Sequence, residues 1–252
     1  MRRDKILAET SSGQVLSRLR IFFRKGKKVK IIGIVASPRG AEGNTARLLH
    51  VVLEGAESQG AEVEVVYLPG RTVLPCKGCN TCHRQGRCPQ KDDFESIREK
   101  ILASDGLVLA SPNYIFNVSA QMKAFIDRCC GVIHCMAFEG KYGASVVTSG
   151  GGDEKPTADY LNHFLINTGI RPVGSVWATM DTITEEVLPA DIMSEARGLG
   201  KKLVQSWQTK VTSPEIEERL KEFQDRMRSL ILYRKEEWPY EYGYWEKHRR
   251  LT

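Results

Sequence analysis

Short apolar runs alternate with helical segments five times along this chain, and this alternation limits its fold more than any other feature. The runs are rich in Val, Ile and Ala and lie at 28–37, 63–68, 106–110, 142–148 and 172–179. Runs that are apolar at nearly every position predict strands buried on both faces, as in a parallel sheet. Segments of helical character lie at 45–58, 92–102, 120–134, 157–168 and 190–209. The chain is therefore predicted to be α/β, a doubly wound five-stranded parallel sheet with helices on both faces.

Length and charge narrow the class further. The 252 residues suffice for one core with extensions, and no apolar run approaches the ~18 residues that cross a bilayer. No secretory signal is recognisable, so a cytoplasmic protein is expected. Ten Lys and Arg fall within residues 1–30, but no nucleic-acid-reading motif accompanies them, so no nucleic-acid partner is expected. We predict a basic extension at 1–27, a main domain at 28–209, and a C-terminal helix with an aromatic tail at 210–252.

Both extensions carry apolar side chains. An apolar stripe at helical spacing in the first consists of Val15, Leu16, Leu19, Phe22 and Phe23. It predicts a helix that packs on the domain or on a sister subunit, or alternatively one that lies on a membrane surface. In the second, Ser213-Pro214-Glu215 is typical of a helix start, and residues 238–245 hold five aromatic side chains. We expect this tail to cover a neighbouring subunit in a homo-dimer or tetramer.

The first apolar run leads into a loop that is polar and contains small residues. Ser37, Arg39, Gly43, Asn44 and Thr45 lie in it, directly before a predicted helix. A loop at this place presents backbone N–H groups to an anion, and glycine lets the ligand approach closely. The fingerprints of dinucleotide-binding loops and P-loops are absent. The loop is predicted to bind a phosphate, and the alternative is a polar turn with Thr45 as a helix cap.

Four of the seven cysteines fall within a short loop. Cys76, Cys79, Cys82 and Cys88 have the spacing C-x2-C-x2-C-x5-C, and Pro89 follows. Three interpretations remain open: a [4Fe–4S] cluster on four thiolates, a zinc ion on four thiolates or on three of them and His83, and a tight loop with free thiols. The other three cysteines, Cys129, Cys130 and Cys135, are interpreted as packing residues of a helix.

Taken together, these motifs resemble those of the NADPH-dependent FMN reductases, a branch of the flavodoxin-like fold. The resemblance covers about residues 29–180 and rests on motifs in the family's order: Ser37-Pro38-Arg39 with Gly43-Asn44-Thr45, Ser111-Pro112-Asn113-Tyr114, residues 123–128, and Thr148-Ser149-Gly150-Gly151. The cysteine spacing is similar to that of the iron–sulfur flavoproteins within this family. The resemblance implies a flavodoxin-like domain that binds FMN.

The resemblance also implies which residues hold the flavin. The first loop would bind its phosphate. The isoalloxazine ring would be lined by Pro112, Asn113, Tyr114, Ile115, Phe116 and Asn117, and approached from the far side by Ser149, Gly150, Gly151 and Gly152. Tyr114 and Phe116 offer stacking faces, with ordinary loop packing as the alternative. No catalytic acid–base pair is needed, because the flavin carries the chemistry.

The implied function is an electron-transferring oxidoreductase. An iron–sulfur flavoprotein accepts electrons from a carrier such as ferredoxin and passes them to a small oxidant. One alternative is a reductase without a cluster, in which NAD(P)H reduces FMN or a quinone. The other is a redox-responsive binding protein whose flavin or thiols control a partner.

Overall fold

Five parallel strands form the central sheet. The computed structural model describes residues 28–179, 188–248 and 251. The strands are β1 (Lys30–Val35), β2 (Glu62–Tyr67), β3 (Gly106–Tyr114), β5 (Tyr142–Ser149) and β6 (Arg171–Thr179), in the order β2-β1-β3-β5-β6, and the two-residue β4 (Asn117–Val118) pairs antiparallel with β3. This is the strand order of the doubly wound flavodoxin-like fold, so the predicted fold class is confirmed.

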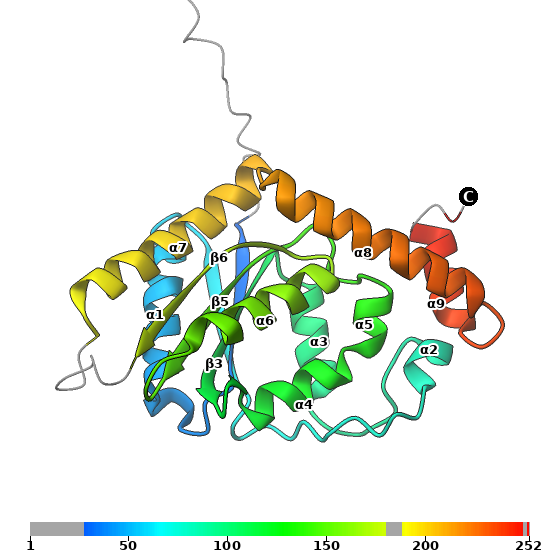
Figure 1. The fold of residues 1–252 in the computed structure, drawn as a ribbon, viewed down its shortest axis with the longest axis horizontal. Helices are drawn as coiled ribbons and strands as arrows, with labels where there is room; N and C mark the ends of the chain where they lie inside the picture. The colour runs from blue at the N-terminus through cyan, green and yellow to red at the C-terminus, as the bar shows by residue number, and fades with distance from the viewer. Residues whose placement is uncertain (1–27, 180–187, 249–250, 252) are drawn as a thin grey trace, which may run out of the picture.

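Helices cover both faces of the sheet (Figure 1). One face carries α1 (Asn44–Glu57) and α7 (Ala190–Thr209), and the other carries α3 (Phe94–Leu102), α4 (Ala120–Arg128) and α6 (Glu154–Asn167). The first strand shows why the sheet is buried on both sides. Ile32 and Ile34 pack with α3, α4 and α6, whereas Ile31 and Val35 pack with α1 and α7. Successive side chains of a strand point to opposite faces, so a continuous apolar run is needed there.

Two predicted elements differ in detail from those observed. The strand predicted at 106–110 continues to Tyr114 and turns back into β4. The helix predicted at 120–134 is divided at Cys129 into α4 and the short α5 (Cys130–His134). The loop between β1 and α1 contains a 3-10 turn, η1 (Gly40–Glu42), and the cysteine loop contains a short helix, α2 (Thr81–Gln85).

The C-terminal segment forms two helices, α8 (Pro214–Tyr233) and α9 (Pro239–His248). The Ser213 hydroxyl caps α8 as predicted, because it accepts a hydrogen bond from the Ile216 N–H at 3.3 Å. The apolar face of α8 packs with α9 and with Met136 and Ile166 of the main domain. Figure 1 shows α8 running along the domain to α9, which lies beside α2.

The aromatic tail packs on its own chain. Trp245 is 1% exposed, and its indole N–H donates to the His134 carbonyl at 2.8 Å. The expectation that this tail covers a neighbouring subunit is therefore wrong for its buried part, because α2 and α5 provide a surface within the same chain. Oligomeric state itself stays a prediction.

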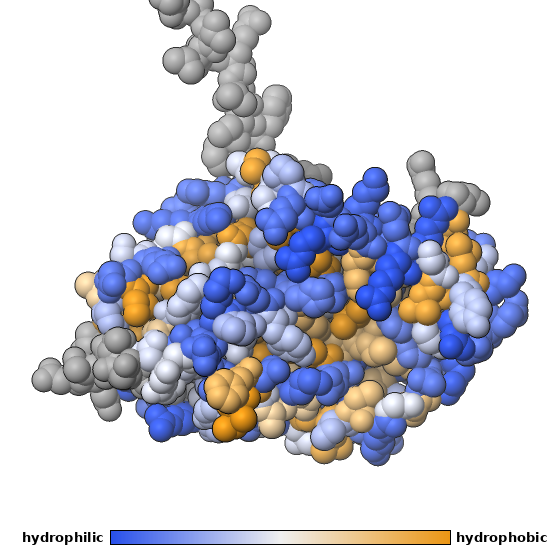
Figure 2. All heavy atoms as spheres, viewed as in Figure 1, coloured by the Kyte–Doolittle hydropathy of each residue, from blue (hydrophilic) through white to orange (hydrophobic). Residues whose placement is uncertain are grey.

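The surface of the molecule is mostly hydrophilic where α6 and α8 face the solvent. Figure 2 shows mostly hydrophilic side chains over α6 and α8, with apolar ones in small separate groups. No helix in the described part of the chain is both long and apolar enough to span a bilayer. The apolar stripe predicted from Val15 to Phe23 lies outside the described residues.

Candidate functional site

Three loops meet at the carboxyl edge of the sheet. They follow β1, β3 and β5, which are neighbours in the sheet. The register places Val35 opposite Ala110 and Pro112 opposite Thr148, so the three strands end at nearly the same level. In doubly wound sheets this edge is where ligands bind. The structure thus brings the predicted flavin-binding residues together at one edge.

The loop after β1 is tightly built. The Ser37 hydroxyl is buried and accepts from the Arg39 N–H at 3.3 Å. A Cβ at Gly43 would lie 2.6 Å from Ser37 Oγ, so any larger residue would displace that hydroxyl. Helix α1 begins at Asn44, which directs its positive end into the loop. Arg39 is exposed and Asn44 half-buried, so both side chains are accessible to a ligand.

The hairpin after β3 carries the most exposed apolar side chains of the three loops. Tyr114 is 48%, Ile115 89% and Phe116 73% exposed. Ile115 and Phe116 have φ of 49° and 62°, a region that β-branched and bulky residues rarely occupy. Two positive φ values in a two-residue hairpin turn are the pattern of a type I′ turn, which normally selects Asn and Gly. The hairpin therefore carries backbone strain at two residues whose large side chains are exposed.

The loop after β5 is organised around Ser149. Its hydroxyl accepts from the Gly152 N–H at 2.8 Å and the Gly151 N–H at 3.3 Å, and it donates to the Glu154 carboxylate. Glu154 is 6% exposed and also accepts from the Thr179 hydroxyl at 2.6 Å. Burial raises the pKa of Glu154, but these hydrogen bonds outweigh it and lower the pKa below its usual value.

Hydrogen bonds join the three loops to one another. The Asn113 amide donates to the carbonyls of Gly152 and Asp153 at 3.1 Å each, which connects the second loop to the third. The buried hydroxyls of Thr45 and Thr148 are 2.6 Å apart, which connects the first to the third. The Ser119 hydroxyl donates to the Ala36 carbonyl at 2.7 Å and connects the second to the first. The edge is thus a preformed, mutually supported set of loops.

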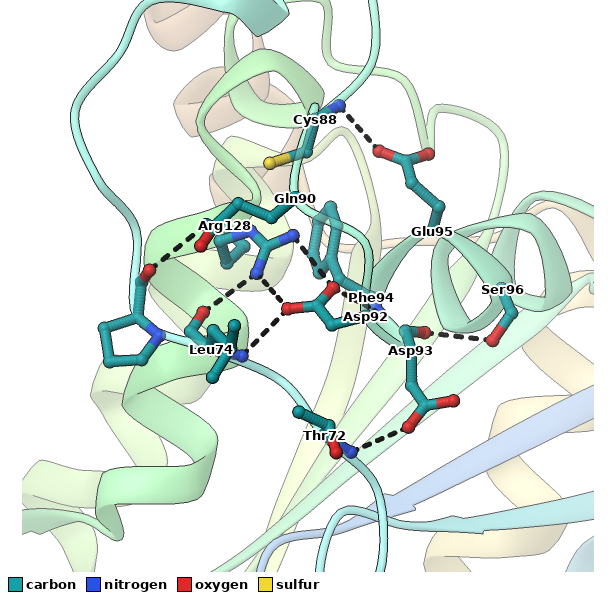
Figure 3. A network of polar contacts seen from close by, with 11 residues as sticks. Thr72, Leu74, Cys88, Gln90, Asp92, Asp93, Phe94, Glu95, Ser96 and Arg128 are labelled. Carbon is teal, nitrogen blue, oxygen red and sulfur yellow. Dashed lines mark hydrogen bonds and ion pairs between the residues drawn. The ribbon is translucent and has the colours of Figure 1, made fainter.

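The cysteine loop is held at its two ends by a buried ion pair (Figure 3). Arg128 of α4 makes two hydrogen bonds to the Asp92 carboxylate, at 2.6 and 3.0 Å, and both side chains are fully buried. Arg128 also donates to the Leu74 carbonyl at 2.9 Å, and the Leu74 N–H donates to Asp92 at 2.9 Å. Leu74 precedes the four cysteines and Asp92 follows them, so the pair closes the loop.

The Arg128–Asp92 ion pair also affects the electrostatic environment of Cys88. Burial raises the pKa of Asp92, but Arg128 and two backbone N–H groups outweigh it and lower the pKa. Burial lowers the pKa of Arg128, but its contacts with Asp92 and with the Cys88 thiol outweigh it and raise the pKa. The buried Nε of Arg128 makes no hydrogen bond to any described residue. The guanidinium is therefore suited to support negative charge on sulfur at Cys88.

The four thiols occupy two environments. Cys82 and Cys88 are half-buried and line a cavity of about 140 Å³, whereas Cys76 and Cys79 are exposed. Hydrogen bonds with Thr81 lower the pKa of Cys79, and the Gly78 N–H donates to Cys76 Sγ at 3.4 Å. The contacts with Thr81 favour a thiolate at Cys79, and thiolates are the ligands of an iron–sulfur cluster. In the described part of the chain the four thiols do not converge within the spacing of a single-ion site, which makes mononuclear zinc the poorer fit.

Gly86 lies in the last spacing of the cysteine motif, between Cys82 and Cys88. Its φ is 73°, and a Cβ there would lie 2.1 Å from the Tyr240 ring of α9. Position 86 therefore favours glycine, both for its backbone conformation and for its close contact with the aromatic tail.

The interpretation of all three remaining cysteines as packing residues needs one correction. Cys129 and Cys135 are buried, as predicted. Cys130, however, lies 3.9 Å from Nε2 of both His83 and His134. Nδ1 of the two histidines lies 2.6 and 3.0 Å, respectively, from the Glu241 carboxylate, which is fully buried. The signal in the sequence was the pair Cys130 and His134, which stand four residues apart and so share a helix face.

Charge in this cluster is strongly coupled. Hydrogen bonds from His134 and His83 lower the pKa of Cys130 to about 6. Burial lowers the pKa of both histidines, but the neighbouring thiols and the carboxylate outweigh it, raising the pKa of His83 to about 12 and that of His134 to about 9. Burial raises the pKa of Glu241, but the two imidazoles outweigh it and lower the pKa.

Known proteins are similar to this chain in sequence and in fold. An iron–sulfur flavoprotein of Archaeoglobus fulgidus is 37% identical over 204 residues, which are 81% of this chain and 91% of that protein. One from Methanocaldococcus jannaschii is 37% identical over 145 residues, 56% of this chain and 75% of that protein.

Solved structures agree on the fold. A flavone reductase has a TM-score of 0.59 at 16% identity, covering 73% of this chain and 65% of its own. The apo form of an NADH:FMN oxidoreductase has a TM-score of 0.54 at 19% identity, covering 75% and 94%. At these identities the likeness concerns the fold alone. The profile of the NADPH-dependent FMN reductases matches residues 29–185, and the chain belongs to that family.

Proposed function

We propose that this chain is an FMN-dependent oxidoreductase that binds one FMN at the carboxyl edge of its sheet. Electrons would pass from a carrier, ferredoxin-like or NAD(P)H, to a small oxidant. The observation that supports this most is the set of hydrogen bonds through which Asn113, Thr45 and Ser119 join the three edge loops. Such preorganisation is what a protein contributes to a bound cofactor, since the flavin supplies the one- and two-electron chemistry.

Each loop has a distinct part in this proposal. The N-terminus of α1, with the Arg39 and Asn44 side chains, would bind the phosphate. The exposed rings of Tyr114 and Phe116 would pack against the isoalloxazine and exclude water. On the opposite side, a Cβ at Gly150, Gly151 or Gly152 would meet no atom within 4 Å, so the backbone is free to approach a planar ring.

We further propose that Cys76, Cys79, Cys82 and Cys88 hold a [4Fe–4S] cluster, which would relay single electrons. The names of the archaeal relatives, the lowered pKa of Cys79 and the guanidinium beside Cys88 support this. The exposure of Cys76 and Cys79 favours the second candidate, a reductase without a cluster. The two differ in iron content and in whether NAD(P)H reduces the flavin directly.

The flavin site is tested by replacing Arg39 and Asn44 together with Ala. Removal of two phosphate partners is expected to weaken FMN binding at least 100-fold, since each hydrogen bond to a charged group contributes about 1.5–3 kcal/mol. Flavin fluorescence quenching measures the dissociation constant. Arg197→Ala, which removes an exposed ion pair with Glu54, is the control. Unchanged FMN affinity in the double variant would remove the phosphate-loop assignment.

The cluster is tested separately by anaerobic purification with iron, sulfide and flavin quantification. Cys79→Ser is expected to abolish bound iron and leave FMN in place, because the phosphate loop is on another strand. Cys129→Ala, a change at a buried thiol outside the loop, should keep both. Wild-type protein that contains flavin but no iron, and is bleached rapidly by NADPH, would refute the cluster and establish the second candidate.

A further inference from the structure

We propose that His83, Cys130 and His134 bind a single transition-metal ion of the Zn²⁺ class, separate from the cysteine loop. Within the described part of the chain, these three are the group whose ligand atoms all lie within 4.8 Å of one another. Zinc accepts thiolate sulfur and imidazole nitrogen as ligands together, so one thiolate with two imidazoles suits it.

The spacing of the three atoms fits one ion. Cys130 Sγ lies 3.9 Å from each Nε2. Zinc binds sulfur at about 2.3 Å and nitrogen at about 2.0–2.1 Å, and a tetrahedral ion therefore places those two atoms about 3.6 Å apart. Small side-chain shifts would bring all three ligands to bonding distance. Three protein ligands leave a fourth position for water.

The carboxylate that contacts both proposed histidine ligands also supports a metal site. Glu241 is fully buried and contacts Nδ1 of both His83 and His134. It therefore fixes the tautomer in which each Nε2 faces Cys130 with a lone pair. A carboxylate behind each metal-binding histidine is the usual outer support of such sites, and here one carboxylate supports two.

Aromatic rings surround the three proposed ligands, and this environment suits a bound metal ion. The rings of His83 and His134 stack with centroids 4.9 Å apart, and Trp238 stacks on His83 at 4.5 Å. A metal ion between Cys130 Sγ and the two Nε2 atoms would bond directly to the sulfur and to both rings. His134 is 16% exposed, which gives an ion a route of entry.

The ion would also explain how distant segments are joined. Residue 83 lies in α2, residues 130 and 134 in α5, and residue 241 in α9. These helices lie together at one end of the molecule in Figure 1. We infer that the ion clamps the C-terminal segment and the cysteine loop to the main domain, so metal binding should raise the melting temperature.

The experiment uses the full-length protein purified anaerobically, stripped with a chelator and titrated with Co²⁺. Binding to one thiolate and two imidazoles should give a sulfur-to-cobalt charge-transfer band and visible bands at wavelengths where oxidised flavin does not absorb. One equivalent is expected in wild type and in Cys79→Ser. The signal should be lost in Cys130→Ser and in His134→Gln. Glu241→Gln should weaken binding about 10- to 100-fold.

Two controls keep the result decisive. His163→Gln changes a histidine on α6 that contacts Arg219 and Asn167, and it should bind cobalt as wild type does. Circular dichroism and melting in chelator show whether each variant folds, and His134→Gln decides if Cys130→Ser does not. Equal cobalt binding by Cys130→Ser and wild type, no binding by wild type, or loss in Cys79→Ser alone would each overturn the proposal.

Discussion

The edge loops and the cysteine-loop end of the molecule differ in how they are assembled. At the sheet edge, each loop is a continuous segment between a strand and the element that follows it. Strand register brings the three together before any hydrogen bond joins them. At the other end, α2, α5 and α9 meet through side chains that are as many as 158 residues apart, as with His83 and Glu241. The first region follows from the topology, whereas the second depends on individual buried polar contacts.

The largest expected effect is at the ion pair that closes the cysteine loop. Arg128→Met would leave the Asp92 carboxylate buried without its partner. Removal of one member of a buried ion pair costs about 3–5 kcal/mol of unfolding free energy. Urea unfolding at pH 7 measures this loss. The phosphate loop does not contact Arg128, so FMN affinity of the folded variant should stay within about threefold of wild type.

Arg197→Met is the matched control for this change, because Arg197 and Glu54 form a half-exposed surface pair. Such a pair contributes about 0–1 kcal/mol. If the two variants lose similar stability, the Arg128–Asp92 pair does not hold the loop. If Arg128→Met also releases FMN, the two regions are coupled and the contrast drawn above fails.

A smaller and pH-dependent effect is expected at the sheet edge from Glu154→Gln. The pKa of Glu154 is lowered in the folded protein, so its stabilisation is present above the unfolded pKa of about 4.3 and is lost as pH falls through the folded pKa. We expect a loss of about 2 kcal/mol at pH 7, the scale of hydrogen bonds to a charged group. Below the folded pKa, wild type and variant should converge.

Urea unfolding at a series of pH values between 7 and 3 checks this expectation. Glu54→Gln, a change at an exposed surface pair, is the control and should cost no more than about 1 kcal/mol at pH 7. A constant difference between Glu154→Gln and wild type at every pH would mean that shape, not charge, stabilises the loop around Ser149.

Most of the fold could be predicted from sequence because its signals are local. Five apolar runs and the helices between them define the sheet, although only the three inner strands are buried along most of their length, and the Ser213 cap defines the start of α8. The missed elements are those that run against local preference. The turn before β4 places Ile115 and Phe116 at positive φ. Only tertiary contacts stabilise such conformations.

The candidate site also has one part that local sequence motifs predicted and one part that they did not. The edge residues could be named because each loop carries its own motif. The cluster at Cys130 was missed because the partners that give it meaning, His83 and Glu241, come from other segments, and a cysteine in a helix is ordinarily a packing residue. The spacing of Cys130 and His134 was informative, but the aromatic tail that completes the cluster has no recognisable metal-binding pattern.

The smallest expected effect concerns the strained hairpin, where we expect a gain. Ile115 is 89% exposed and has φ 49°, so Ile115→Gly removes little buried surface and relieves strain of about 1–3 kcal/mol. The greater backbone entropy of glycine offsets about 0.5–1 kcal/mol of this. The unfolding free energy should therefore rise by about 1 kcal/mol. FMN affinity should fall several-fold, because the variant lacks an apolar side chain of the hairpin that is proposed to line the flavin. Ile115→Asn, which tolerates positive φ, should behave alike. Unchanged stability would mean that the turn is not strained, and a stabilised variant with undiminished FMN affinity would mean that the strain serves something other than the flavin.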